Sequence, residues 1–166
     1  MRPKKNKGYT FIELIMVMVI IGIISVVSVT RIIESSTLSF GINLATIKDH
    51  IRFAADYALS RSVTTVVSFD VANNRYSIFK EDLSGRTLLI NPETNSDFVI
   101  QLGDANFDGV ILTNIDVNST NEIKFYSYGV PFDANDIKIS SQAFLEINSQ
   151  NAITIYPVSG YCSVLK

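Results

Sequence analysis

Two residues with nucleophile or base chemistry stand far apart in this chain. His50 is the one histidine and Cys162 the one cysteine among its 166 residues. A Cys–His or Ser–His site needs an imidazole within hydrogen-bond reach of the nucleophile. We expect His50 to lie on a helix as a partly exposed structural residue, and Cys162 to lie in a strand near the other end of the chain. We therefore predict no catalytic site and interpret the chain as a non-enzyme.

A second candidate is a metal loop that runs from Asp104 through Asn106 and Asp108 to Gly109. Its oxygen-bearing side chains alternate, and glycine holds the sixth position, as in the first half of an EF-hand calcium loop. The twelfth position is Ile115, where that loop needs a bidentate glutamate. Turns rich in Asp and Asn are common before strands, so we interpret the segment as a plain turn, with calcium as the weaker alternative. We expect no cofactor.

The third candidate is a lone carboxylate, Glu13, near the start of a long apolar segment. Residues 9–29 number about 21 and would form a helix of roughly 31 Å at 1.5 Å per residue. That length matches the hydrocarbon core of a bilayer, which is about 30 Å thick. An unpaired charge there costs about 2.5–3.5 kcal/mol, so Glu13 needs a partner. The basic leader, residues 1–8, would keep the N-terminus in the cytoplasm.

Two ordinary interpretations of this segment are a secretory signal peptide and a plain membrane anchor. A signal peptide ends its apolar run in a cleavage site of small residues, and no such site follows Val29. A plain anchor remains possible, but it leaves Glu13 unexplained.

The N-terminus, KG-YTFIELIMVMVIIGIIS, resembles the prepilin signal of type IV pilins and type II secretion pseudopilins. The resemblance implies that the prepilin peptidase cuts between Gly8 and Tyr9 and that the new amine of Tyr9 is methylated. It further implies that Glu13 pairs with the Tyr9 amine of a neighbouring subunit, as a device for assembly and register. Tyr9 stands where the family usually has phenylalanine, which is a conservative aromatic change.

The segment that follows, residues 30–62, is expected to continue as an amphipathic helix. Its apolar residues recur mostly every three or four positions, which predicts one stripe that lies against a following domain. The predicted stripe comprises Leu38, Ile42, Ala45, Ile47, Ile51, Ala54, Ala55, Ala58 and Leu59.

After Ser62 the pattern changes to short β-branched runs broken by Asn, Gly, Pro and Asp. Many short strands at regular spacing predict an antiparallel sheet or a small β-sandwich. The predicted strands are Thr64–Asp70, Arg75–Lys80, Arg86–Ile90, Phe98–Leu102, Val110–Thr113, Glu122–Tyr126, Ile137–Ser140, Phe144–Asn148, Ile153–Pro157 and Tyr161–Leu165.

The predicted fold class is α+β, with the long N-terminal helix packed on that antiparallel sheet or sandwich. Its first half would span the membrane, and its second half would pack on the sheet. The predicted core comprises Val67, Phe69, Tyr76, Ile78, Ile111, Ile123, Phe125, Leu145, Ile147, Ile153 and Ile155.

The C-terminal half is similar, less specifically, to H-type minor pseudopilins and to the T and U types of minor pilin. The similarity rests on Phe125-Tyr-Ser-Tyr-Gly129-Val-Pro131 and on a strand–Gly–strand ending around Gly160. Physically, Gly129 with Pro131 is a sound turn pair, and Gly160 suits a hairpin turn.

Charge argues against nucleic acid as a partner. Loss of the leader would remove four of the 14 basic residues and none of the 16 acidic ones, leaving an excess of six acidic side chains. DNA binding requires clustered Lys and Arg. DNA-binding relatives of the T type carry arginines in a C-terminal segment, whereas Lys166 is the one charge in SGYCSVLK. The other cations of the β region are scattered: Arg75, Lys80, Arg86, Lys124 and Lys138.

We therefore interpret the chain as a minor pilin or pseudopilin, with four segments at 1–8, 9–29, 30–62 and 63–166. It would be a single-pass inner-membrane protein, with its C-terminal domain in the periplasm or outside the cell in a filament. Its expected partners are the prepilin peptidase, other pilins or pseudopilins, the inner-membrane assembly platform and lipid. The alternatives are a DNA-binding minor pilin of a competence filament and a membrane-anchored receptor domain. A pilus, a secretion pseudopilus and a competence filament all fit.

Overall fold

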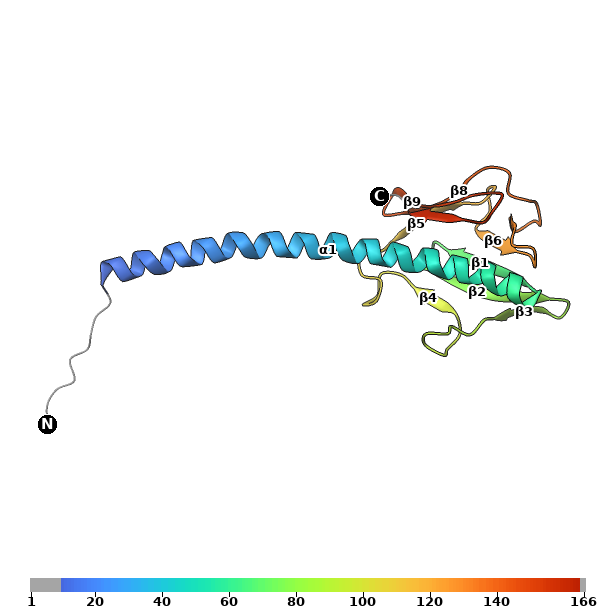
Figure 1. Ribbon diagram of the computed structural model, residues 1–166, viewed down its shortest axis with the longest axis horizontal. Coiled ribbons are helices and arrows are strands. Elements are labelled where there is room, and N and C mark those ends of the chain that lie inside the picture. Colours follow the sequence, from blue (N-terminus) through green and yellow to red (C-terminus); the bar gives the residue numbers. More distant parts are fainter. Residues whose placement is uncertain (1–9, 165–166) are drawn as a thin grey trace, which may run out of the picture. The chain divides into compact units, whose positions relative to one another are not determined.

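The computed structural model describes the backbone of residues 10–164, and their side chains except at 26–38 and 151. The chain forms two compact units, residues 1–39 and 40–166, which are described separately. Helix α1 (Phe11–Arg61) begins in the first unit and ends in the second (Figure 1). The described strands are β1 (Thr64–Asp70), β2 (Arg75–Asp82), β3 (Gly85–Leu88), β4 (Val99–Gln101), β5 (Leu112–Asp116), β6 (Glu122–Phe125), β7 (Pro131–Phe132), β8 (Ala143–Ile147), β9 (Gln150–Ile155) and β10 (Cys162–Val164).

In the first unit, α1 starts directly after Thr10. The backbone N–H groups of Glu13 and Leu14 donate to the Thr10 carbonyl at 3.1 and 3.3 Å. Glu13 lies in the first turn, where a negative charge interacts favourably with the helix dipole. The Ser25 hydroxyl donates to the Ile21 carbonyl at 2.7 Å, so this polar group is satisfied within the helix.

Where side chains are described, no helix combines the length and the apolar character needed to cross a membrane. The predicted span, residues 9–29, includes Tyr9 and the side chains of 26–29, which lie outside the described residues.

The second unit contains the C-terminal part of α1 and all the described strands. The buried stripe of this helix follows steps of three and four residues, as predicted, through Leu44, Ile47, Ile51, Ala54 and Ala58. Two predicted members, Ile42 and Leu59, are wrong, because both are more than half exposed. At 100° per residue Ile42 falls on the opposite side from Leu44, the member that the prediction missed. Of the other predicted members, Ala45 and Ala55 are half-buried, and the side chain of Leu38 is not described.

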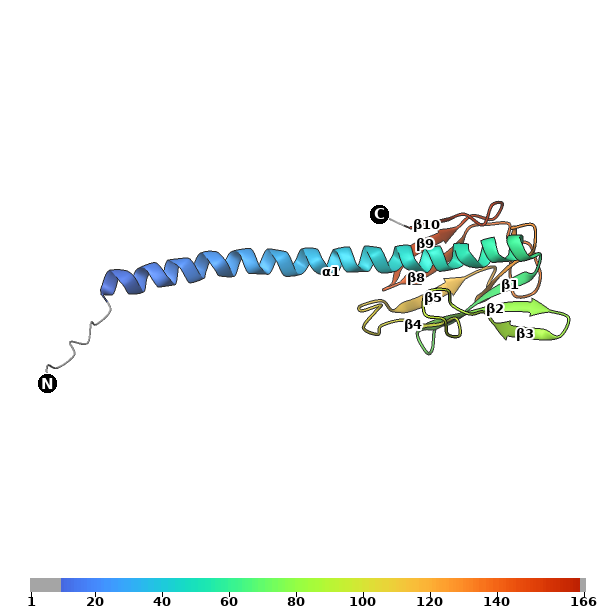
Figure 2. The same ribbon diagram turned by 60° about the horizontal axis from the view of Figure 1, so that its bottom comes forward.

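The strands form two antiparallel sheets. The first has the order β3-β2-β1-β6-β7, with β4 also paired to β2, and the second has the order β10-β9-β8-β5. The Thr65 hydroxyl donates to the Ala54 carbonyl at 2.8 Å and ties β1 to α1, which runs along this sheet in Figure 2. The α+β prediction is confirmed.

Every predicted core residue is buried except Ile111, which is 59% exposed. Val110 and Leu112 on either side of it are buried. Alternate residues of an extended chain point to opposite faces. Because Val110, Ile111 and Leu112 are all apolar, the sequence did not show which of them faces the core. The strand also begins at Leu112 rather than Val110.

The predicted strand at 137–140 is also wrong. Only one isolated bridge, between Phe132 and Lys138, forms there. The Ile137 N–H instead donates to the Asp133 carboxylate at 2.9 Å, and the Ile139 N–H donates to the Pro131 carbonyl at 3.2 Å. A loop folded around Asp133 therefore takes the place of a ladder.

Candidate functional site

The first candidate is the N-terminal part of α1. Gly8 and Tyr9 lie outside the described residues, so cleavage between them and methylation of Tyr9 stay predictions. Glu13 is described, and its side chain is exposed in the first helical turn. A carboxylate so placed can accept a hydrogen bond from, and form an ion pair with, a cationic group outside its own helix.

The helix surface around Glu13 is apolar on all sides. Every described side chain from Thr10 to Ser25 is exposed, including Phe11 at 80% and Met16 at 66%. A helix that is apolar all round is normally covered by lipid or by other protein. We therefore expect lipid or other protein to cover this surface. Glu13 is the one charged side chain described on it.

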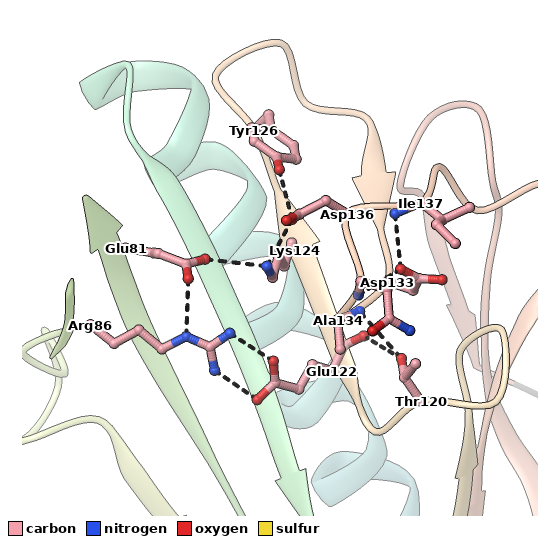
Figure 3. Close-up of polar contacts among 11 residues, drawn as sticks. Glu81, Arg86, Thr120, Glu122, Lys124, Tyr126, Asp133, Ala134, Asp136 and Ile137 are labelled. Carbon is pink, nitrogen blue, oxygen red and sulfur yellow. Dashed lines mark hydrogen bonds and ion pairs between the residues drawn. The ribbon is translucent and has the colours of Figure 1, made fainter. Parts of the chain in front are cut away.

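The second candidate is a polar cluster on the face of the first sheet that points away from α1. We call it the polar ladder: Glu81, Arg86, Glu122, Lys124, Tyr126 and Asp136 (Figure 3). The strand register pairs Glu81 with Arg86, and it pairs Val66 with Lys124. Directly paired residues share a face, so this face carries the ladder while Thr65 faces α1.

Arg86 joins two strands that are not neighbours. From β3 its guanidinium reaches Glu122 on β6 at 2.8 and 2.9 Å, and its Nε donates to Glu81 on β2 at 3.2 Å. Paired contacts of this kind fix geometry as well as charge. They raise the pKa of the guanidinium, with the hydrogen bond to Glu122 as the largest cause.

Lys124 is the buried cation of the ladder, at 5% exposure. Its Nζ lies 2.7 Å from Asp136 and 3.6 Å from Glu81 (Figure 3). The hydrogen bond from Lys124, followed by one from Tyr126 at 2.8 Å, lowers the pKa of Asp136. The bond to Asp136 in turn raises the pKa of Tyr126 to about 12. Val66 on the same face is completely buried, and the lysine stem opposite it accounts for part of that cover.

Asp133 anchors the loop that carries Asp136. Its carboxylate accepts hydrogen bonds from the backbone of Asn135 and Ile137 at 2.8 and 2.9 Å. The Thr120 hydroxyl accepts a longer bond from Ala134 at 3.4 Å (Figure 3). The ladder and Asp133 together hold this loop on the sheet, so the arrangement positions backbone rather than reacting groups.

The ladder also bears on the nucleic-acid alternative. Arg86 and Lys124 are held by carboxylates within it. Elsewhere, Arg75 pairs with Asp70 at 3.0 Å, and Lys80 pairs with Asp82 at 2.9 Å. Four of the five scattered cations therefore face acids, and DNA binding, which depends on free clustered cations, is not favoured.

The calcium-loop candidate lies in a tight turn. The Asp104 carboxylate accepts the backbone N–H groups of Asn106 and Phe107 at 3.0 Å each, and Gly109 adopts a φ of 72°. Among the side chains that the structure describes, no three His, Cys, Asp or Glu residues gather to hold a metal ion. Calcium binding at Asp104, Asn106 and Asp108 stays a prediction.

His50 and Cys162 have separate partners. His50 is 7% exposed, so its predicted partial exposure is wrong; it packs against Tyr76 and Phe98 beneath the sheet. Cys162 is buried and donates to the Gly160 carbonyl at 3.5 Å. Burial raises the pKa of its thiol to about 12. Neither is arranged as a nucleophile with its base.

The ladder was missed at the sequence level. The alternation of Glu122, Lys124 and Tyr126 along one strand marks a polar face, and that signal was available. The partners on β2 and β3 were not, because they depend on the order of strands in the sheet.

Comparisons with known proteins match the N-terminus to a family model and the fold to a solved structure. The model of the prokaryotic N-terminal methylation motif matches residues 3–29. The solved structure of the minor pseudopilin EpsH from the Type 2 Secretion System of Vibrio cholerae has a similar fold, with a TM-score of 0.51 and 12% sequence identity. The match covers 76% of this chain and 96% of that chain. No curated protein matches the chain.

Proposed function

We propose that this chain, which combines a prepilin-type N-terminus with the fold of a minor pseudopilin, is a minor pilin or pseudopilin: a structural subunit that enters a filament through its N-terminal helix. The observation that carries the proposal is Glu13, one carboxylate in the first turn of α1, where every described apolar side chain from Phe11 to Ile24 is exposed.

Glu13 acts in assembly in this proposal. In a low-dielectric environment, an ion pair between its carboxylate and the amine of Tyr9 on a neighbouring subunit is strongly attractive. A carboxylate buried there without a partner is heavily penalised. The pair therefore favours one axial register between helices over the others.

Processing and location follow from the same proposal. The prepilin peptidase removes residues 1–8, and Tyr9 becomes the methylated N-terminus. Residues 9–29 anchor the subunit in the inner membrane, where the assembly platform draws it into the filament. Residues 30–62 continue the stem, and 63–166 form the β domain in the periplasm or outside the cell. The subunit itself is not an enzyme.

Replacement of Glu13 tests this assignment. In native cells, Glu13→Ala should insert and lose its leader normally, because the change makes the helix more apolar. Its content in sheared filaments should fall about tenfold or more, because no carboxylate faces the neighbouring amine. Met16→Ala, one turn along the same exposed helix, serves as the matched control and should assemble. Normal assembly of Glu13→Ala would rule out the proposed role.

A further inference from the structure

His50 lies between α1 and the first sheet, within the second unit. Its side chain is 7% exposed. Its Nδ1 is 2.5 Å from the Tyr76 hydroxyl on β2, and its ring meets Phe98 at a centroid distance of 5.0 Å and an angle of 88°. Helix, strand and the segment before β4 therefore meet at this one imidazole.

The other ring nitrogen is unsatisfied. Nε2 of His50 is the one buried side-chain nitrogen or oxygen without a hydrogen-bond partner among the described residues. Nε2 is unpaired in both neutral tautomers, because the hydrogen bond to the Tyr76 hydroxyl is made by Nδ1 in either case. The protonated ring would have an N–H donor and a positive charge at this buried position, which is the costlier state.

Phe98, which contacts the His50 ring, is the last residue of the segment Leu89–Phe98, which we call the flap. It closes on itself through Asn91 N–H to Ser96 O at 2.8 Å and Phe98 N–H to Leu89 O at 2.7 Å. It attaches to β2 where the Phe98 carbonyl accepts the Ile78 N–H at 3.0 Å. Phe98 is 1% exposed and also stacks on Phe53 of α1.

Three titratable groups surround His50 from the elements that pack against it: Tyr76 on β2, Glu93 on the flap and Asp49 on α1. Desolvation by burial lowers the pKa of His50, and the two carboxylates oppose that effect more weakly. Burial, followed by the charge of Glu93, raises the pKa of Tyr76 far above neutral pH, so its hydroxyl stays protonated. Among these groups the imidazole is the one whose ordinary pKa, 6.5, lies near neutral pH.

We propose that the flap is an acid-opened cover, which releases from α1 when His50 takes up a proton. Opening gives Nε2–H access to water, moves Phe98 off the charged ring and breaks the flap's own bonds at the Asn91 and Phe98 amides, while β1, β2 and the second sheet keep their pairing. The device goes beyond the proposed filament role and does not depend on it.

Hydrogen exchange on the full chain in detergent micelles tests the flap directly, with protection factors corrected for intrinsic rates at pH 7.5 and 5.0. Acid should lower the protection of the Asn91 and Phe98 amides by up to about thirtyfold, the limit that an ordinary pKa of 6.5 in the open state sets at pH 5.0. The Leu145 and Ile153 amides of the second sheet should not follow. Unchanged flap protection, or an equal fall at all these amides, overturns the proposal.

His50→Gln is the matched variant, since glutamine can still bond Tyr76 but does not titrate in this range. It should abolish the acid response of the flap, and an undiminished response contradicts the inference. A second measurement does not need this variant and tests the proposal even if the variant fails to fold. The wild-type chain has one histidine, so its imidazole NMR signals titrate alone. A midpoint at or above the ordinary value of 6.5 overturns the proposal.

Discussion

Gly160 lies against the backbone of Gly129, so the turn between β9 and β10 rests on the turn between β6 and β7. A Cβ added at Gly160 would sit 3.3 Å from the Gly129 carbonyl oxygen and 3.1 Å from Cε1 of Phe125. Gly160 also has a φ of 62°, in the left-handed region that favours glycine. The two turns belong to different sheets, and this contact joins them.

Gly160→Ala should therefore destabilise the β domain by about 2–3 kcal/mol, because the new methyl group adds a clash to the backbone strain. Gly109→Ala is the control, since Gly109 has a φ of 72° with open space around its would-be Cβ. That variant should lose only about 1 kcal/mol. Urea unfolding curves of the two variants compare these losses, and equal losses would show that the contact with Gly129 contributes nothing.

Lys124→Ala should lower the free energy of unfolding by about 2 kcal/mol, because it removes a buried cation from two carboxylates and the stem that covers Val66. Lys124→Met keeps an apolar stem and should recover about half of that loss. Lys80→Ala, which breaks an exposed pair with Asp82, should have a smaller effect than either. A loss for Lys124→Ala no larger than that for Lys80→Ala would show that the polar ladder does not contribute to the stability of the fold.

The pKa of Asp136 should rise toward its ordinary value of 3.8 in Tyr126→Phe, and further in Lys124→Met, because Lys124 is the larger cause of the lowering. A carboxylate whose pKa is lowered by folding stabilises the fold above its unfolded pKa. That contribution is lost as the pH falls below about 3.8 and through the folded value. Carboxyl NMR titration measures both shifts. An unchanged Asp136 midpoint in both variants would contradict the contacts in the ladder.

Cys162 should resist thiol reagents in the folded chain. With a pKa of about 12, only about one thiol in ten thousand is ionised at pH 8, and the thiolate is the reactive form. Labelling with a maleimide should be slow in buffer and fast in denaturant, as followed by intact mass. Rapid labelling of the folded chain would contradict the burial of Cys162 and would mean that the β9–β10 end opens readily.

The elements with strong local patterns were predictable from sequence. The strands β1 and β2 are one example: both were predicted, and Asp70 pairs with Arg75 across the turn between them. The helical stripe through Ile47, Ile51 and Ala54 is another. In both cases a period of two or 3.6 residues carried the information.

Features that depend on side-chain hydrogen bonds to the backbone, or on contacts between distant segments, could not be predicted in this way. Ile137 and Ile139 alternate with polar residues as in a strand. The Ile137 N–H, which a neighbouring strand would need, instead donates to the Asp133 carboxylate. His50 reads as a polar residue on a helix flank, but it is buried against Tyr76 of β2 and Phe98 of the flap. Arg86 on β3 meets Glu122 on β6 across the two strands that lie between them. That order of strands cannot be read from local sequence patterns.

The most direct test of the filament role is photo-crosslinking from position 16 in native cells. Met16 is 66% exposed on the helix that we propose packs against other subunits. A photoreactive residue there should capture pilin-like proteins, identified by mass spectrometry, in chains whose N-terminus begins at Tyr9. If the leader stays attached and no pilin-like protein is captured, the chain is a plain anchored domain and the account of Glu13 is wrong.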